Sequence, residues 1–330
     1  ADTICKGGDS KVNEVSGTVK TGNIIGWEYR PHSTNAWTEI PNSSTTLDVL
    51  NLLETTTYRA VYKNGTCDTM HSNYITIDVR ELPLATLAGS ATVCEGDSTD
   101  LTVTVSNVGT LQDWEIDYLE GVTSLTMTGT GSGTFTLRVG NFNTNTDITL
   151  QEIRTVSGTP QCTNDKLTNN ATVTVAVNQR PYASLNSTVS PVCQGSTSSF
   201  DVTVSNVRSG ESWTLTYDVD DAVFGATYSG VGPGTFTIAT PSLVDAKTYS
   251  VDLLLIENTT TTCDSTLSGS MSIVVDETTD PGTVSGDTTV CFAANSGTVR
   301  QTGGNGSIIR WEYSEDNGVT WTTISSTAAT

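Results

Sequence analysis

Apolar and polar residues alternate one by one along many short segments of this chain. In one segment Leu101, Val103 and Val105 alternate with threonines, and a later segment carries apolar residues at Tyr249, Val251, Leu253 and Leu255. Successive side chains of a β-strand point to opposite faces of a sheet, so this period of two predicts strands with one buried face. The nearest approach to a helical period is Leu47–Glu54, which is short. The pattern therefore predicts an all-β fold.

A cysteine followed by a tryptophan marks a repeat in the chain. Trp114 follows Cys94 by 20 positions, and the spacing recurs in the pairs Cys193–Trp213 and Cys291–Trp311. Near the start, Trp27 follows Cys5 by 22 positions. Self-similarity at a fixed period is the signature of a tandem array of small domains.

Local motifs divide the repeats into two types. The sequence VTVSNV stands at Val103–Val108 and again at Val202–Val207, in the two inner repeats, which we call type b. IIGWEY at Ile24–Tyr29 resembles IIRWEY at Ile308–Tyr313, in the two outer repeats, which we call type a. The predicted order is therefore a, b, b, a.

Proline-bearing junctions place the boundaries between repeats. They lie at Arg80–Leu84, Asn178–Tyr182 and Asp276–Gly282, each directly after an apolar strand. We therefore predict repeat 1 at residues 1–80, repeat 2 at 81–177, repeat 3 at 178–276, and a truncated repeat 4 at 277–330. Such short junctions predict a semi-rigid array, because proline restricts the backbone there. Several short strands per repeat in a Cys…Trp…Cys order resemble immunoglobulin-like β-sandwiches.

The seven cysteines are predicted to form one bond within each complete repeat. The expected pairs are Cys5–Cys67, Cys94–Cys162 and Cys193–Cys263. Cys291 is left unpaired by truncation, and its partner is expected beyond Thr330. Each first cysteine precedes a turn, so the bond is expected at an end or edge of the sandwich. Structural disulfides indicate an oxidising, extracellular location.

Charge and hydropathy narrow the classes of partner. The formal net charge is −21 with a pI near 4.2, which disfavours nucleic acids and anionic lipids because few cations are available to replace counterions. No apolar run is long enough to insert into a membrane. We expect neither partner.

Residues for catalysis are scarce. His32 and His71, the only histidines, both belong to repeat 1, so the other repeats cannot carry a histidine-based triad or metal site. The glycines of Gly129–Thr136 precede a strand pattern, which predicts a β-turn and not a phosphate-binding loop. We predict no enzyme activity and no catalytic residue.

Ser314–Trp321 matches the Asp-box pattern of sialidase propellers. In physical terms this is a hairpin turn in which Asp316 accepts backbone amide hydrogen bonds and Gly318 takes a positive φ. The box is a fold element remote from catalysis, so it does not indicate a sialidase.

Two possible ligand sites remain open. Carboxylates in Tyr217–Asp221 could hold Ca²⁺ through oxygen ligands, although a solvated loop is favoured, and no cofactor is expected. Trp37 and Trp321 follow the repeat tryptophans of the type a repeats by ten positions. Both are expected to pack, with a flat platform for stacking on sugars as the alternative.

Type a motifs carry a resemblance to a known class of repeats. They are Gly282–Gly286, Ile308–Ile324 and Thr56–Cys67 followed by YITIDV. These resemble the Ig-like repeats of very large Bacteroidota surface proteins exported by the type IX secretion system, which include the mobile adhesins of gliding flavobacteria. The resemblance implies surface display and a longer array. Its expected partners are further copies of the repeats in the parent chain, surface glycans or other cell-surface proteins.

The same resemblance implies O-glycosylation at Asp-Ser/Thr sequences. The matching positions are Thr3, Thr69, Ser98, Ser265 and Thr288. The function that we expect is a non-catalytic structural and adhesive segment of an extracellular filament. The alternatives are a carbohydrate-binding array that uses exposed tryptophans and an accessory region of a secreted enzyme.

Overall fold

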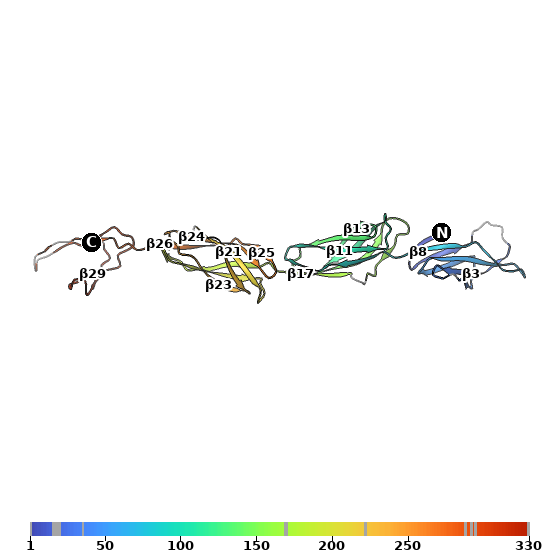
Figure 1. Ribbon diagram of the computed structural model, residues 1–330, viewed down its shortest axis with the longest axis horizontal. Helices are drawn as coiled ribbons and strands as arrows, with labels where there is room; N and C mark the ends of the chain where they lie inside the picture. The colour runs from blue at the N-terminus through green and yellow to red at the C-terminus, as the bar shows by residue number, and fades with distance from the viewer. Residues whose placement is uncertain are drawn as a thin grey trace. The chain divides into compact units, whose positions relative to one another are not determined.

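The computed structural model describes residues 2–14, 21–34, 36–167, 171–220, 223–286, 289–290, 293 and 296–328. Every regular element among these residues is a β-strand (Figure 1). The chain divides into two compact bodies, residues 1–178 and 179–330, which are described separately. The all-β prediction is confirmed.

Repeat 2 is a sandwich of two sheets. The larger sheet has the order β10 (Ala91–Cys94), β17 (Thr172–Asn178), β15 (Thr146–Thr155), β12 (Asp113–Glu120) and β13 (Thr123–Thr130), with β16 (Thr163–Asn164) paired to β15. The smaller sheet has the order β14 (Gly133–Gly140), β11 (Ser98–Ser106) and β9 (Leu84–Ala88). In the larger sheet β10, which comes first along the chain, pairs in parallel with β17, which comes last along the chain. The other strand pairs of repeat 2 are antiparallel. This is an immunoglobulin-like arrangement.

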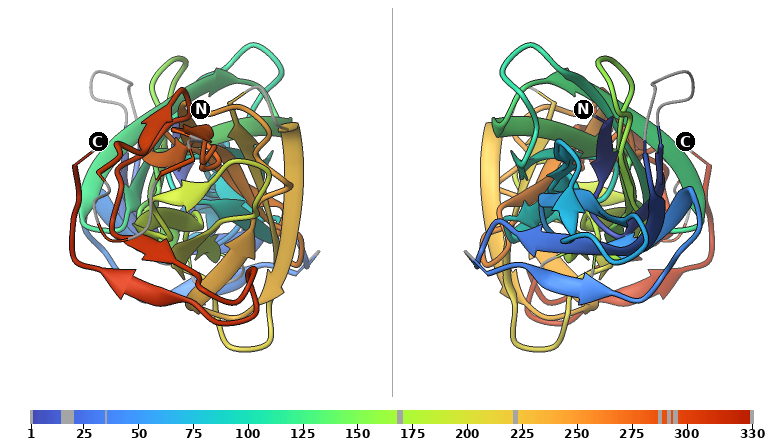
Figure 2. Two further views of the ribbon diagram at one scale, coloured as in Figure 1. Left: turned by 90° about the vertical axis from the view of Figure 1, so that its left-hand side faces the viewer. Right: turned by 90° about the vertical axis from the view of Figure 1, so that its right-hand side faces the viewer.

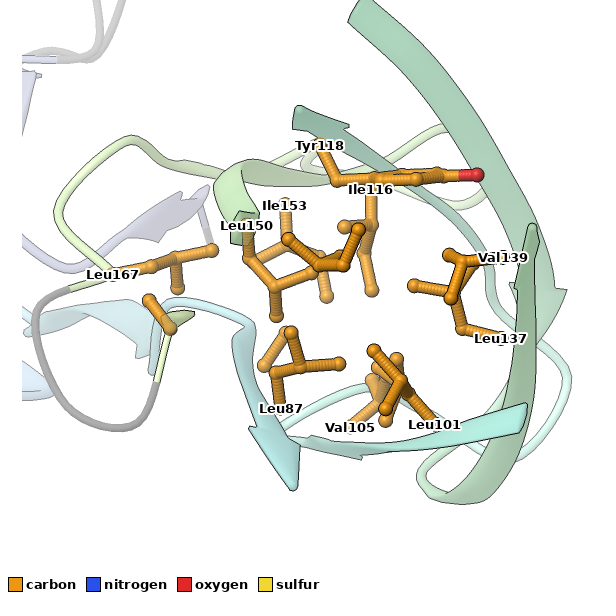
Figure 3. Packing of buried hydrophobic residues seen from close by; sticks show 14 of the residues in the cluster. Leu87, Leu101, Val105, Ile116, Tyr118, Leu137, Val139, Leu150, Ile153 and Leu167 are labelled. Carbon is orange, nitrogen blue, oxygen red and sulfur yellow. The ribbon is translucent and has the colours of Figure 1, made fainter. Parts of the chain in front are cut away.

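Alternating residues of the two sheets of repeat 2 fill the space between them. Figure 3 shows Leu87, Leu101 and Val105 from the smaller sheet pointing toward Ile116 and Ile153 from the larger one. All five side chains are buried. The period of two in the sequence thus produces one shared apolar layer.

The repeat tryptophan of each type b repeat lies against a glycine on the neighbouring strand. Trp114 of β12 faces Gly129 of β13, and its indole N–H donates to the carbonyl of Gly131 at 2.9 Å. Trp213 faces Gly230 in repeat 3 in the same way. A β-carbon on either glycine would overlap the indole ring. The glycine-rich segments therefore make room for the tryptophan, and a phosphate-binding loop does not form there.

Repeat 3 repeats this topology. The larger sheet has the order β19 (Val192–Cys193), β26 (Ser270–Asp276), β24 (Thr248–Asn258), β21 (Ser212–Val219) and β22 (Val223–Val231), with β25 (Cys263–Thr266) paired to β24. The smaller sheet has the order β18 (Tyr182–Thr188), β20 (Ser199–Ser205) and β23 (Gly234–Ala239). Its core cluster includes Phe200, Trp213 and Tyr249.

Repeat 1 is a smaller version of the same sandwich. Its larger sheet has the order β1 (Asp2–Cys5), β8 (Ile75–Arg80), β6 (Thr56–Lys63), β3 (Asn23–Pro31) and β4 (Thr38–Ile40), with β7 (Met70–His71) paired to β6. The second sheet is β2 (Gly8–Asn13) with β5 (Thr46–Leu52). Trp27 and Ile77 lie in its core. Its strands are the blue ones in the right-hand view of Figure 2.

The predicted repeat 4 has two strand pairs among its described residues. β27 (Thr283–Ser285) pairs with β28 (Arg300–Thr302), and β29 (Trp311–Tyr313) pairs with β30 (Thr322–Ile324). They are drawn in orange and red in the left-hand view of Figure 2. Trp311 is half-buried and donates its indole N–H to the carbonyl of Ala328 at 2.8 Å.

Candidate functional site

The cysteines mark the two ends of each repeat. We call the end at which the chain passes on to the following repeat the distal end, and the opposite end the proximal end. The first cysteine of each complete repeat is the last residue of a strand that runs parallel to the final strand of that repeat. Its register partner is the last residue of the final strand: the pairs are Cys5 with Arg80, Cys94 with Asn178, and Cys193 with Asp276. All three first cysteines therefore lie at distal ends.

A Cys-x-Gly turn fixes this position in all three repeats. The residue after each cysteine donates its amide to the carbonyl of the register partner, at 2.8 Å for Lys6, 2.9 Å for Glu95 and 2.8 Å for Gln194. The glycine that follows has a positive φ, of 79° at Gly7, 83° at Gly96 and 81° at Gly195. Glycine adopts this conformation without strain, so the motif sets the chain direction after the cysteine.

The second cysteine of repeat 2 lies at the proximal end. The amide of Cys162 donates to the hydroxyl of Thr155, the last residue of β15, at 2.8 Å. Two residues later, Asn164 donates from Nδ2 to the carbonyl of Pro83 at 2.9 Å. Pro83 belongs to the junction that leads into repeat 2, so Cys162 lies beside the incoming chain.

Repeat 3 places Cys263 at the same end. Cys263 is opposite Asn258, the last residue of β24. The next residue, Asp264, accepts hydrogen bonds from Arg180 Nη1 at its carbonyl oxygen, 2.7 Å, and at its carboxylate, 3.1 Å. Arg180 belongs to the junction that leads into repeat 3.

One disulfide joins two consecutive repeats. Cys5 at the distal end of repeat 1 is bonded to Cys162 at the proximal end of repeat 2, with 5.6 Å between their Cα atoms. The predicted pairs Cys5–Cys67 and Cys94–Cys162 are therefore wrong. The bond encloses 157 positions of the chain, which corresponds to about 5 kcal/mol in the chain-entropy model.

Sheet geometry explains why a bond within a repeat does not form. Cys94 ends a strand that runs alongside β17, whose residue Val175 is opposite Thr146. Cys162 lies against Thr155, nine residues further along the same strand β15. At the rise of a β-strand this places the two cysteines about 30 Å apart. A disulfide requires Cα atoms within about 7 Å.

The remaining cysteines fall into two states. Cys94 and Cys263 are disulfide-bonded, whereas Cys67 and Cys193 carry free thiols and are exposed. The predicted pair Cys193–Cys263 is therefore also wrong, because Cys193 is not oxidised. Cys291 lies outside the described residues.

A cleft of about 340 Å³ lies beside Cys162 at this junction. It is lined by the junction residues Arg80, Glu81 and Pro83 and, from repeat 2, by residues that include Gln112 and Cys162. Lys6 Nζ and a carboxylate oxygen of Glu81 are 3.0 Å apart at the same junction. The junction between the first two repeats is thus held by a covalent bond and by polar contacts.

Trp37 and Trp321 differ in their surroundings. Trp37 is half-buried, and the guanidinium groups of Arg30 and Arg59 lie 5.0 and 4.0 Å from the centre of its ring. These cations occupy the π-surface that a sugar would stack on. Trp321 has 61% of its surface exposed.

The two histidines lie in different surroundings. His71 Nε2 lies 3.4 Å from a carboxylate oxygen of Glu28, which also pairs with Arg59 at 2.6 Å. His32 is exposed. Among the described residues, no group of three or more histidine, cysteine or acidic side chains could hold a metal ion.

The proposed Ca²⁺ loop is held by protein groups where the structure describes it. The carboxylate of Asp218 accepts the amide of Gly225 at 2.5 Å, and Asp220 lies 4.0 Å from Lys247 Nζ. Asp221 lies outside the described residues. The described carboxylates of this loop thus contact protein donors.

The Asp-box turn forms as predicted. Asp316 accepts the amides of Val319 and Thr320 at 3.0 and 2.8 Å, and Gly318 has φ of 90°. Hydrogen bonds from the hydroxyl and amide of Thr320 and from the hydroxyl of Ser314 lower the pKa of Asp316 to about 2.

The predicted glycosylation positions differ in exposure. Thr69 is exposed, whereas Thr3, Ser98 and Ser265 are half-buried. Ser98 packs its side chain over Gly140. Thr288 lies outside the described residues. Thr69 is thus the most accessible of the four described positions.

An ion-pair cluster on repeat 2 was not predicted from the sequence. Arg154 lies 2.5 Å from Glu115, 2.5 Å from Asp117 and 3.2 Å from Glu152. Hydrogen bonds from Arg154 and then from Thr126 lower the pKa of Asp117. The signal that could have revealed the cluster is register, because Glu115 is opposite Arg154 on adjacent strands.

Comparison with known families gives a partial match. The matching family model is described as a domain of unknown function (DUF8696). It matches residues 1–81 and 280–330, which cover the two type a repeats almost completely. The chain matches no curated protein.

Several solved structures are similar at low identity. An adhesin described as a "Ca2+-stabilized adhesin" that "helps an Antarctic bacterium reach out and bind ice" is 13% identical, with a TM-score of 0.39, over 94% of this chain and 81% of that one. A marsupial T cell receptor is 12% identical, with a TM-score of 0.33, over 76% and 94%. Fibronectin(III)-like modules of CbhA from Clostridium thermocellum are 13% identical, with a TM-score of 0.24, over 54% and 90%. Within the described part of this chain, no helix has the length and hydropathy of a membrane span.

Proposed function

We propose that this chain is a non-catalytic structural segment of an extracellular adhesin, in which tandem sandwiches set a distance and bear tension. The observation that carries the proposal is the bond from Cys5 to Cys162, because it joins one repeat covalently to the next. A bond of this kind adds a second covalent path beside the peptide junction. Structural disulfides are typical of oxidising compartments outside the cytoplasm.

The finer proposal follows the resemblance of the type a motifs. The segment belongs to a large Bacteroidota surface protein exported by the type IX secretion system and taking part in gliding. It carries O-linked glycans, and Thr69 is the described candidate with the greatest exposure. Its partners are further repeats of the parent chain together with glycans or proteins of other surfaces.

Trp321 favours a second candidate function, carbohydrate binding. Its exposed indole is the kind of surface that stacks on a sugar ring. Trp37, at the corresponding position of the other type a repeat, is covered by two guanidinium groups. The two functions separate in a glycan-binding assay of the chain and of a Trp321→Ala variant. Binding that the substitution abolishes would favour the carbohydrate-binding function over the structural one.

Force spectroscopy tests the structural proposal. The chain is held by its two ends and stretched, first oxidised and then with a reductant. The oxidised chain should hide the 157 positions between Cys5 and Cys162 from the force, and reduction should release roughly 500 Å of extended chain from them. If the oxidised and reduced chains release the same length, the bond bears no tension and the proposal is wrong.

Surface labelling tests the location. Antibodies raised against the 330-residue chain should label intact cells, and brief external proteolysis should remove the label. Labelling that appears only after the cells are permeabilised would contradict surface display.

A further inference from the structure

The states of the cysteines follow a pattern that reaches beyond the observed bond. A first cysteine at a distal end is bonded to the second cysteine of the next repeat in the pair Cys5–Cys162. We propose that this is the rule of the array: each first cysteine bonds the second cysteine of the repeat that follows. Cys94 then bonds Cys263. We call this series of bonds between consecutive repeats the ladder. The free thiols of Cys193 and Cys67 are its open positions: Cys193 bonds a following repeat of the parent chain, and Cys67 bonds a preceding one.

The first step is the geometry of the bonded junction. Lys6, next to Cys5, donates its amide to the carbonyl of Arg80 at 2.8 Å. Asn164, two residues after Cys162, donates to the carbonyl of Pro83 at 2.9 Å. Both cysteines are therefore tied to one short segment of the chain, and they are bonded.

The second junction has the same two attachments. Glu95, next to Cys94, donates its amide to the carbonyl of Asn178 at 2.9 Å. Asp264, next to Cys263, accepts from Arg180 at 2.7 Å. Asn178 and Arg180 are two residues apart, so their Cα atoms are separated by no more than about 8 Å. Each cysteine is thus tied, within its own repeat, to one end of the same short junction, and both cysteines are disulfide-bonded.

Cys193 has the distal geometry of the two bonded first cysteines. Its strand runs parallel to the final strand of repeat 3, and Gln194 donates to the carbonyl of Asp276 at 2.8 Å. The glycine of its turn, Gly195, has φ of 81°, within a few degrees of its counterparts. The side chain is exposed, so a sulfur atom from a following repeat can reach it.

Cys67 has the proximal geometry of the second cysteines. It precedes the short strand β7, which pairs with β6, as Cys162 precedes β16, which pairs with β15. Its thiol is exposed. Cys67 belongs to a type a repeat, and the predicted order a, b, b, a places a type a repeat directly after repeat 3. The Cys67-type cysteine is therefore the kind of partner that Cys193 would bond.

Each bond of the ladder forms when a disulfide such as oxidised glutathione oxidises two cysteine thiols. One cysteine thiolate attacks the glutathione disulfide, forms a mixed disulfide and releases the first glutathione thiolate. The thiolate of the partner cysteine attacks the mixed disulfide at the protein sulfur and releases the second. The two electrons and two protons of the cysteine thiols leave in two molecules of reduced glutathione.

Peptide mapping of the 330-residue chain tests the rule. Trypsin leaves Cys263 and Cys291 together in the peptide Thr248–Arg300, so the mapping uses a Cys291→Ser chain. The chain is oxidised, its free thiols are blocked with N-ethylmaleimide, and it is digested without reduction. We expect the Cys94 peptide, Glu81–Arg138, to be linked to Thr248–Arg300.

Other results would overturn the rule. A Cys94 peptide linked to the Cys162 peptide, Thr155–Lys166, would show a disulfide within the repeat. A Cys94 that carries N-ethylmaleimide would show that it forms no disulfide. The link between Ala1–Lys6 and Thr155–Lys166 is the internal control for the digestion.

The open positions are tested in two preparations. In the 330-residue chain, N-ethylmaleimide should modify both Cys67 and Cys193 without denaturant. In the parent protein isolated from the cell surface, both should resist the reagent and appear in disulfide-linked peptides from neighbouring repeats. Modification of either cysteine in the parent protein would overturn the ladder beyond repeats 1 to 3. It would leave the labelling test of surface location unaffected, so the two proposals fail separately.

Discussion

The indole ring of Trp213 lies directly against the α-carbon hydrogens of Gly230 on the neighbouring strand. A β-carbon at Gly230 would lie 2.8 Å from Cη2 of Trp213, closer than side chains approach one another. Trp114 and Gly129 repeat the arrangement in repeat 2. Because both tryptophans are almost fully buried, the ring has no room to move aside.

We expect Gly230→Ala to destabilise repeat 3 by about 1–3 kcal/mol, since overpacking forces the ring or the strand to shift. The matched control is Gly269→Ala, where a β-carbon would meet its nearest atom at 3.8 Å. Chemical denaturation followed by tryptophan fluorescence measures both. Equal stability of the two variants would show that the close approach of glycine and indole is not required.

Removal of the inter-repeat bond should lower stability without unfolding the sandwiches. We expect Cys5→Ser and Cys162→Ser each to cost about 2–5 kcal/mol, and the double variant no more than either one, because both remove the same bond. Cys67→Ser is the control, since its thiol is free. Denaturation curves of the four variants and the wild type measure these losses, and additive losses in the double variant would contradict a shared bond.

Arg154 should contribute more to the stability of the fold than a more exposed surface cation does. Its three carboxylate neighbours repel one another once the guanidinium is gone, so Arg154→Gln should cost about 1 kcal/mol at low salt and less in high salt, where the repulsion is screened. Arg138→Gln, which breaks a more exposed pair with Asp100, is the control and should have a smaller effect. A loss that is independent of salt would exclude an electrostatic cause.

Asp117 should make stability depend on pH in the acid range. Arg154 holds the pKa of Asp117 below its usual value, so the carboxylate stabilises the fold above the ordinary aspartate pKa near 3.9. This contribution is lost as the pH falls through the lower pKa of the folded state. We expect the stability difference between the wild type and Asp117→Asn to be constant from about pH 5 upward and to shrink below about pH 4. A difference that grows in acid would reverse the sign that we assign.

The carboxylate of Asp316 should stay ionised to an unusually low pH. Its pKa of about 2 reflects hydrogen bonds from Thr320 and Ser314 to the ionised carboxylate. Carboxyl-carbon NMR should therefore show Asp316 still ionised at pH 3, while exposed aspartates are largely protonated. Thr320→Val, which removes the hydroxyl that donates to Asp316, should raise the midpoint. An unchanged midpoint in this variant would exclude the hydroxyl as a cause.

The sequence carried most of the information on the fold because the sandwich follows from periodicity. Leu101, Val103 and Val105 alternate with polar residues, and all three are buried against the second sheet. The tryptophan spacing identified the repeats, and Trp27, Trp114 and Trp213 are all in cores.

The cysteine pairing was not predictable from spacing. Spacing along the chain shows which cysteines share a repeat, but pairing depends on which end of the sandwich each occupies. The parallel pairing of β10 with β17 puts Cys94 at the distal end, and the hydrogen bond to Thr155 puts Cys162 at the proximal end. Both cysteine positions depend on how the strands are paired and in which register, and this cannot be read from the spacing of cysteines along the sequence.

Side chains on the outer faces were also beyond prediction. Whether Trp37 is a platform or a packed ring depends on Arg59, which comes from a strand that follows Trp37 by about 20 residues. Local alternation indicates which face a side chain occupies. It does not indicate which long side chain from the next strand will cover it.

The bond from Cys5 to Cys162 also changes what a cut in the chain would do. The junction at Arg80–Leu84 is short and carries the basic residue that trypsin-like proteases recognise. In most tandem proteins a single cut there would release everything on one side of it. Here both fragments would stay attached through sulfur, because the junction lies inside the loop that the bond closes. One broken peptide bond at this junction would therefore leave the two repeats joined, and proteolysis there would become visible only after the disulfide is reduced.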